Sequence, residues 1–113
     1  MKSLPREEIL RLMKTLYSHT WSYICKTYKL AEEFMREFKD EVDWEEISIY
    51  QVLSASFMEE FEDRLDWDYL SSYQKLDEEF IRKYKDKVLW LWIVLDQDIS
   101  LQFIEEFEHY IYN

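Results

Sequence analysis

The chain has 113 residues, which is enough for one domain with a substantial core, and its 48% apolar and 19% aromatic residues exclude a disordered chain. Glycine is absent and Pro5 is the single proline, which excludes the positive-φ turns of most β-hairpins and phosphate-binding loops. The net charge of −11 disfavours direct binding to nucleic acid or to anionic membranes, and favours a protein partner with a basic surface. We therefore expect helices joined by tight polar turns.

Residues 1–18 predict an N-terminal capping helix. Ser3 is placed to cap a helix that Pro5 begins, and Ile9, Met13 and Leu16 lie on one apolar stripe. The segment lacks the apolar core of a signal peptide, and no apolar run reaches membrane-spanning length. We therefore expect a soluble protein in the cytoplasm, in a host cell if its origin is viral, and with no membrane partner.

Four copies of a 23-residue unit follow, at residues 19–41, 42–64, 65–87 and 88–110. The positions that repeat without exception are the tryptophans Trp21, Trp44, Trp67 and Trp90 and the phenylalanines Phe34, Phe57, Phe80 and Phe103. A further aromatic residue follows each of these phenylalanines by four positions. This register predicts tandem structural repeats.

Each unit predicts two short helices. Asp43 can cap a helix of roughly two turns that begins at Trp44, and Ser54 can cap a second helix of roughly three turns that carries Phe57 and Phe61. One unit is too small to bury its own aromatic face, so neighbouring units must stack. We predict a single all-α domain over residues 1–113, an α-solenoid-like stack of four helix-turn-helix repeats plus the capping helix.

The pattern Asp-Trp-x-x-Ile/Leu-Ser-x-x-Gln-x-Leu-Ser/Asp-x-x-Phe-Ile/Met-x-x-Phe/Tyr runs from Asp43 to Phe61 and again from Asp66 to Tyr84. It resembles the short tryptophan-containing helical repeats of large DNA virus and phage proteins, and the resemblance covers residues 19–110. It implies a viral or phage origin and an interaction role, and it brings no catalytic motif. The first copy departs from the pattern at Thr20 and Tyr28, and the fourth at Leu89 and Val94.

Catalytic and metal-ligating residues are scarce. The two histidines, His19 and His109, and the single cysteine, Cys25, have no spacing that suits a zinc site or a nucleophile–base pair. Cys25 occupies the position of Ser48 and Ser71 in later copies, which predicts a small residue that fills space beside the core. We expect no enzyme activity, no metal and no cofactor.

Two recurring features have competing interpretations. The glutamines Gln51, Gln74 and Gln97 could line a groove, but an amide that recurs at a helix end more often satisfies backbone groups of the neighbouring turn. The tryptophans could stack on bases, but a groove in this chain would be acidic, so packing in the core or between neighbouring repeats is favoured.

The fourth copy breaks the pattern of the others. Leu91, Trp92 and Leu95 stand where earlier copies mostly carry polar residues. Two interpretations stay open: the terminal segment covers this patch, or the patch is exposed for a partner or for self-association.

Three functions compete. The leading one is an acidic protein-interaction module, a viral or phage-type inhibitor of a host protein. A nucleic-acid mimic of the anti-CRISPR or anti-restriction type and a homodimeric structural scaffold are the alternatives. The predicted partner-binding residues are Leu91, Trp92, Leu95, Glu59, Glu60, Glu62, Asp63, Glu105 and Glu106.

Overall fold

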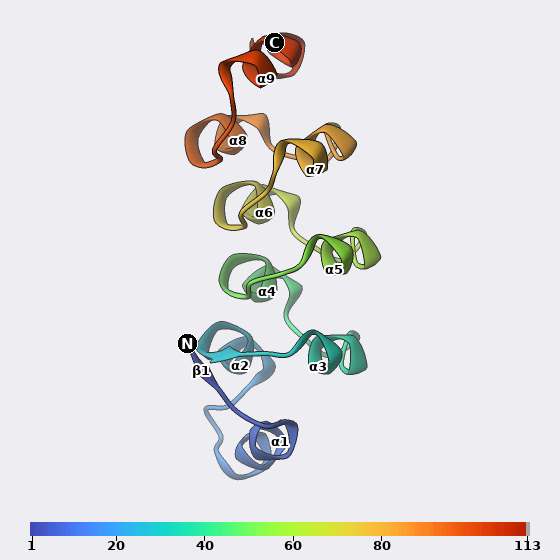
Figure 1. Cartoon of the computed structure of the whole chain (residues 1–113). Coiled ribbons are helices and arrows are strands. Elements are labelled where there is room, and N and C mark those ends of the chain that lie inside the picture. The colour runs from blue at the N-terminus through green and yellow to red at the C-terminus, as the bar shows by residue number, and fades with distance from the viewer. Residues whose placement is uncertain (113) are drawn as a thin grey trace. The chain divides into compact units, whose positions relative to one another are not determined.

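The computed structural model describes residues 1–112 and shows short helices with one pair of two-residue strands (Figure 1). The all-α prediction is confirmed. The chain divides into two compact units, Met1–Leu65 and Asp66–Asn113. The division falls one residue after the predicted boundary between the second and third repeats, and each unit holds two repeats. Whether the chain forms a single domain stays a prediction.

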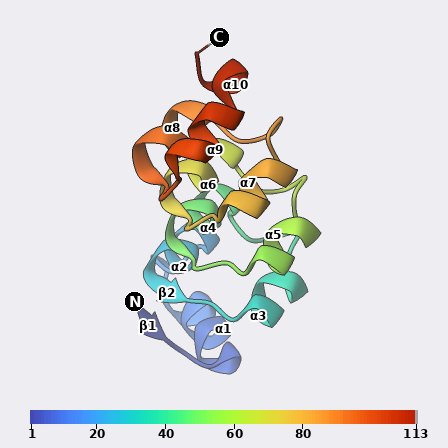
Figure 2. The same cartoon turned by 45° about the horizontal axis from the view of Figure 1, so that its top comes forward.

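The first unit contains the N-terminal segment and two repeats. Its elements are β1 (Lys2–Ser3), α1 (Arg6–Thr15), α2 (Trp21–Thr27), β2 (Tyr28–Lys29), α3 (Glu32–Glu37), α4 (Trp44–Tyr50) and α5 (Ala55–Glu60). Helices α2 and α4 pack side by side, and β1 pairs in parallel with β2, with Lys2 opposite Tyr28 (Figure 2). The prediction that Ser3 caps α1 is wrong, because Ser3 lies in β1 and Pro5 takes the N-cap position without a side-chain hydrogen bond.

The second unit contains the other two repeats. Its elements are α6 (Trp67–Tyr73), α7 (Glu78–Lys83), α8 (Trp90–Asp96), α9 (Leu101–Glu106) and α10 (Glu108–Tyr112). Helices α6 and α8 pack side by side, as α2 and α4 do in the first unit, and α10 packs against α8 and α9. Stacking of equivalent helices from successive repeats therefore builds both units.

Five of the helices begin at the caps that the sequence places. Asp43 and Asp66 accept hydrogen bonds from the backbone N–H of Glu46 and Tyr69, at 3.1 and 3.2 Å. Ser54, Asp77 and Ser100 cap the second helices in the same way. These bonds satisfy N–H groups that the first turn of a helix cannot pair internally.

The second helix of each repeat is shorter than the predicted three turns. α5 ends at Glu60, because Phe61 leaves helical geometry with φ −111° and ψ 29°. A separate turn follows, in which the N–H of Leu65 donates to the Phe61 carbonyl at 3.1 Å. The change of direction brings the chain to the start of the next repeat without any positive φ among the described residues.

Aromatic clusters form the core of each repeat. Trp44 packs on Phe57 and Phe61, with ring centroids 6.1 and 4.9 Å away. The indole Nε1–H of Trp44 donates to the Lys39 carbonyl in the turn that ends the preceding repeat, at 2.9 Å. Trp90 repeats this bond with the Lys85 carbonyl at 2.9 Å. These contacts confirm the packing interpretation for Trp44, which is half-buried, and Trp90, which is buried. Each of the two indoles also ties its repeat to the one before.

Gln51 and Gln97 satisfy backbone carbonyls at helix C-termini in a chain that has no glycine to end its helices. Helix α2 ends at Tyr28 in an extended conformation, without the left-handed residue that often satisfies the last carbonyls of a helix. Gln51 of the next repeat supplies the missing partners: its Nε2 donates to the carbonyls of Cys25 and Tyr28 at 2.8 and 2.7 Å, and its Oε1 accepts from the Leu30 N–H at 2.9 Å. Gln97 makes the equivalent bonds to Ser71, Gln74 and Leu76. The structural interpretation of these two glutamines is confirmed.

Candidate functional site

The residues with catalytic or metal-binding chemistry are dispersed. His19 is buried and its Nε2 lies 2.8 Å from the Tyr28 hydroxyl, while His109 is exposed on α10. Within residues 1–112, no three His, Cys, Asp or Glu side chains come together in a way that could hold a metal ion. The remaining candidates for a functional site are surface patches and grooves.

Cys25 is fully buried, as its position in the repeat predicts. Burial raises the pKa of its thiol to about 11, against the opposing effect of a hydrogen bond from the Asp43 backbone. Ser71, at the equivalent position of the third repeat, accepts a hydrogen bond from the Leu89 N–H at 2.9 Å. Both side chains thus anchor the start of the following repeat, a role that the sequence did not reveal.

Two of the acidic residues predicted to bind a partner are engaged within the chain. Arg36 of the preceding repeat donates hydrogen bonds to Glu60 from both Nε and Nη2. Arg82 donates to Glu106 in the same way, and the ion-pair distance is 2.9 Å in both pairs. These hydrogen bonds lower the pKa of both carboxyl groups. Because their charges are locally compensated, they add less to an acidic surface than the sequence indicates.

The other acidic residues on that list lie at the surface. Glu59, Asp63 and Glu105 are exposed, and Glu62 is half-buried. Glu59, Glu62 and Asp63 belong to the first unit, and Glu105 belongs to the second. Their role in binding stays a prediction.

The apolar patch of the fourth repeat is exposed. Leu91 and Leu95 are 60% and 63% exposed, and Trp92 is 37% exposed. The terminal helix α10 covers a different residue, since Tyr110 packs on Trp90 with ring centroids 5.5 Å apart. Of the two open interpretations, coverage by the terminal segment is therefore wrong.

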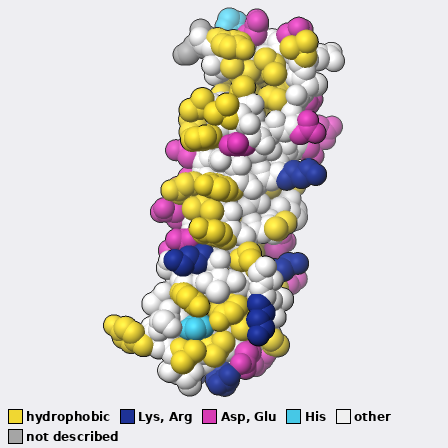
Figure 3. Space-filling view, turned by 90° about the vertical axis from the view of Figure 1, so that its left-hand side faces the viewer, with side chains coloured by type: hydrophobic (Ala, Val, Ile, Leu, Met, Phe, Trp, Pro, Cys, Tyr) yellow, Lys and Arg dark blue, Asp and Glu magenta, His cyan; other side chains and the backbone are white. Residues whose placement is uncertain are grey.

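A groove between α6 and α8 contains Trp92. It has a volume of ≈ 290 Å³ and is lined by Asp68, Tyr69, Ser72, Tyr73, Trp92 and Asp96. The Ser72 hydroxyl donates to Asp96 Oδ2 at 2.9 Å, which holds that carboxylate in place. The space-filling view of Figure 3 shows apolar side chains gathered at the surface of each unit. The groove thus combines aromatic rings with two carboxylates.

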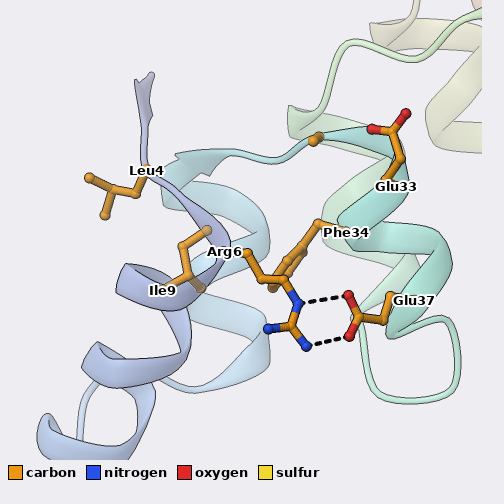
Figure 4. Close-up of a pocket in the computed structure, with 7 residues that line it drawn as sticks. Leu4, Arg6, Ile9, Glu33, Phe34 and Glu37 are labelled. Atoms are coloured by element: carbon orange, nitrogen blue, oxygen red, sulfur yellow. Dashed lines mark hydrogen bonds and ion pairs between the residues drawn. The ribbon is translucent and has the colours of Figure 1, made fainter.

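Two further cavities lie elsewhere in the chain, with volumes of ≈ 160 and ≈ 360 Å³. One, of ≈ 160 Å³, lies where α1 meets α3, and the Arg6–Glu37 ion pair forms part of its wall beside Ile9 and Phe34 (Figure 4). The other lies at the link that follows α6, where Gln97 already bonds the backbone. Structural hydrogen bonds engage Arg6 and Glu37 in the first cavity and Gln97 in the second.

Of the residues that line the groove, only Trp92 was predicted from the sequence as a binding residue. The missing signal was the repeat register: Tyr69 precedes Trp92 by 23 residues, and Tyr73 precedes Asp96 by the same interval. Since equivalent helices stack side by side, residues one repeat apart become neighbours.

No described helix has the length and apolarity needed to cross a membrane. Comparisons with protein-family models, with curated proteins and with solved structures found no match to this chain.

Proposed function

We propose that this chain is a non-enzymatic protein-binding module that recognises its partner through the α6–α8 face around Trp92. The observation that carries the proposal is the exposure of Trp92, Leu91 and Leu95 on α8 beside a groove with two carboxylates. Exposed aromatic residues in a concave setting are the side chains that dominate binding energy in protein interfaces. The net charge of −11 favours a partner with a basic surface.

The resemblance to viral and phage repeats supports a further step of the same proposal. A small acidic binding module from such a source would act as an inhibitor of a host protein, inside the host cell. This step rests on the resemblance alone.

The experiment is affinity capture from a candidate host lysate, followed by binding measurements with the purified partner at low and high salt. Trp92→Ala is the test variant, and Tyr17→Ala is the control, since Tyr17 is a fully exposed aromatic residue in the other unit. We expect Trp92→Ala to weaken binding by about 2 kcal/mol or more, as for an interface hot spot. A partner that binds both variants equally would refute the proposed face.

The homodimer alternative has one observation in its favour, the two exposed leucines beside Trp92. Sedimentation of wild type and Leu91→Ala separates it: a dimer that the substitution dissociates would support self-association. The nucleic-acid mimic has weaker support, because Arg36 and Arg82 compensate two of the carboxylates it would use.

A further inference from the structure

Arginine side chains inside this chain occupy a repeated kind of site. The Arg36 guanidinium lies over the Phe57 ring, 5.7 Å from its centroid, and bonds the Glu60 carboxylate. In the second unit, Arg82 lies 5.3 Å from the Phe103 centroid and bonds Glu106. Each site combines an aromatic face with a carboxylate, which suits a planar guanidinium.

The N-terminal segment uses the same arrangement. Arg6 lies over Phe38, 5.6 Å from the ring centroid. Its Nε donates to Glu37 Oε1 at 2.8 Å (Figure 4). An arginine from outside the repeats is therefore accepted by a repeat in the same way as an arginine from within them.

The groove between α6 and α8 presents these two chemical features again. Tyr73 and Trp92 contribute aromatic rings, and Asp68 and Asp96 contribute carboxylates. Among the described residues that line it, none is a lysine or an arginine. The Ser72 hydrogen bond engages Oδ2 of Asp96.

We propose that this groove binds an arginine side chain from an exposed basic segment of the partner protein. The inference rests on the proposed function and names what the α6–α8 face recognises. The volume of ≈ 290 Å³ lies at the lower limit of small-molecule sites, about 300 Å³, and so suits a single long side chain. The carboxylates of the groove repel an anion. The aromatic rings attract a cation, and this cation–π attraction offsets the partial loss of the cation's hydration.

Arginine fits this groove better than lysine for a geometric reason. A guanidinium can stack on an aromatic face while its edge donates to carboxylates, and it is less strongly hydrated than an ammonium group. The three internal sites use that geometry.

The test is an NMR titration of the full chain with a blocked peptide of sequence Ala-Ala-Arg-Ala-Ala. Matched peptides carry lysine or neutral citrulline at the central position. The readout is the indole N–H resonance of Trp92, assigned with Trp92→Phe. For a ligand of this size we expect a Kd of about 1 mM, with citrulline at least about tenfold weaker and lysine about threefold weaker.

Two double variants distinguish binding by the carboxylates of the groove from attraction by the net negative charge of the chain. Asp68→Asn combined with Asp96→Asn should weaken arginine binding about tenfold, because both carboxylates leave the groove. Glu79→Gln combined with Glu108→Gln changes the net charge equally at exposed positions of α7 and α10, and should leave the Kd within about twofold at moderate salt.

Three results would overturn the inference: no shift of the Trp92 resonance with the arginine peptide, equal binding of citrulline, or an equal loss in both double variants. If a captured partner depends on Trp92 while the arginine peptide gives none of the expected shifts, the proposed function stands and the arginine site fails. If the arginine peptide binds as expected but no protein partner depends on Trp92, the arginine site stands and the proposed function fails.

Discussion

Replacement of Gln51 by leucine tests the account of how the repeats are joined. Gln51 is 2% exposed and makes three hydrogen bonds to the backbone that links α2 to α3. Leucine has nearly the same size but has neither donor nor acceptor. The substitution leaves the Leu30 N–H and the carbonyls of Cys25 and Tyr28 without these partners.

The magnitude follows from the burial of those groups. Cys25 and Leu30 are buried and Tyr28 is half-buried, so two groups bear most of the desolvation cost of about 1–3 kcal/mol each. The apolar leucine side chain recovers about 1–2 kcal/mol of this loss. We expect a net loss of about 2–4 kcal/mol, a large part of the roughly 5–15 kcal/mol that stabilises a typical domain.

The assay is urea unfolding followed by circular dichroism, with Gln102→Leu as the control. Gln102 is exposed on α9, so the same chemical change there should alter stability by less than about 0.5 kcal/mol. If Gln51→Leu were no less stable than this control, the glutamine would not be the link between repeats that its bonds indicate.

Two further predictions concern ionisable groups. The raised pKa of Cys25, about 11 against 9.0, predicts alkylation at pH 8 roughly a hundredfold slower than for an ordinary thiol, and rapid alkylation in urea; fast labelling of the folded chain would contradict the buried anchor. For Glu106, the hydrogen bond from Arg82 lowers the folded pKa, so its contribution to stability is present above the unfolded pKa near 4.5 and is lost as the pH falls through the folded value. The urea midpoint of Glu106→Gln should therefore fall less than that of wild type between neutral and acidic pH, while Gln102→Leu, which removes no ionisable group, should follow the wild type.

Several features of the fold follow from local sequence. The tryptophan interval predicts where α4, α6 and α8 begin, and Asp43 and Ser54 cap helices at the predicted positions. These predictions succeed because a cap and an amphipathic turn involve residues within one turn of each other. The prediction failed at Ser3, where pairing of β1 with β2 prevails over the local capping preference.

Features that join one repeat to the next were only partly predictable. The role of Gln51 could be inferred, because the absence of glycine leaves helix carbonyls in need of a partner. The engagement of Glu60 by Arg36 could not, since the two residues are 24 positions apart and only stacking brings them together.

The sequence by itself determined the class of the fold, the period of the repeat and the residues that point into the core, because these depend on interactions within one helix turn and on the burial of aromatic side chains. Only the tertiary structure decided which surface groups are neighbours. It paired Glu60 and Glu106 with arginines, left Trp92 exposed and placed it beside Tyr69 and Asp96. The physical reason is that contacts between stacked repeats depend on the geometry with which each pair of helices packs, and no single repeat contains that geometry.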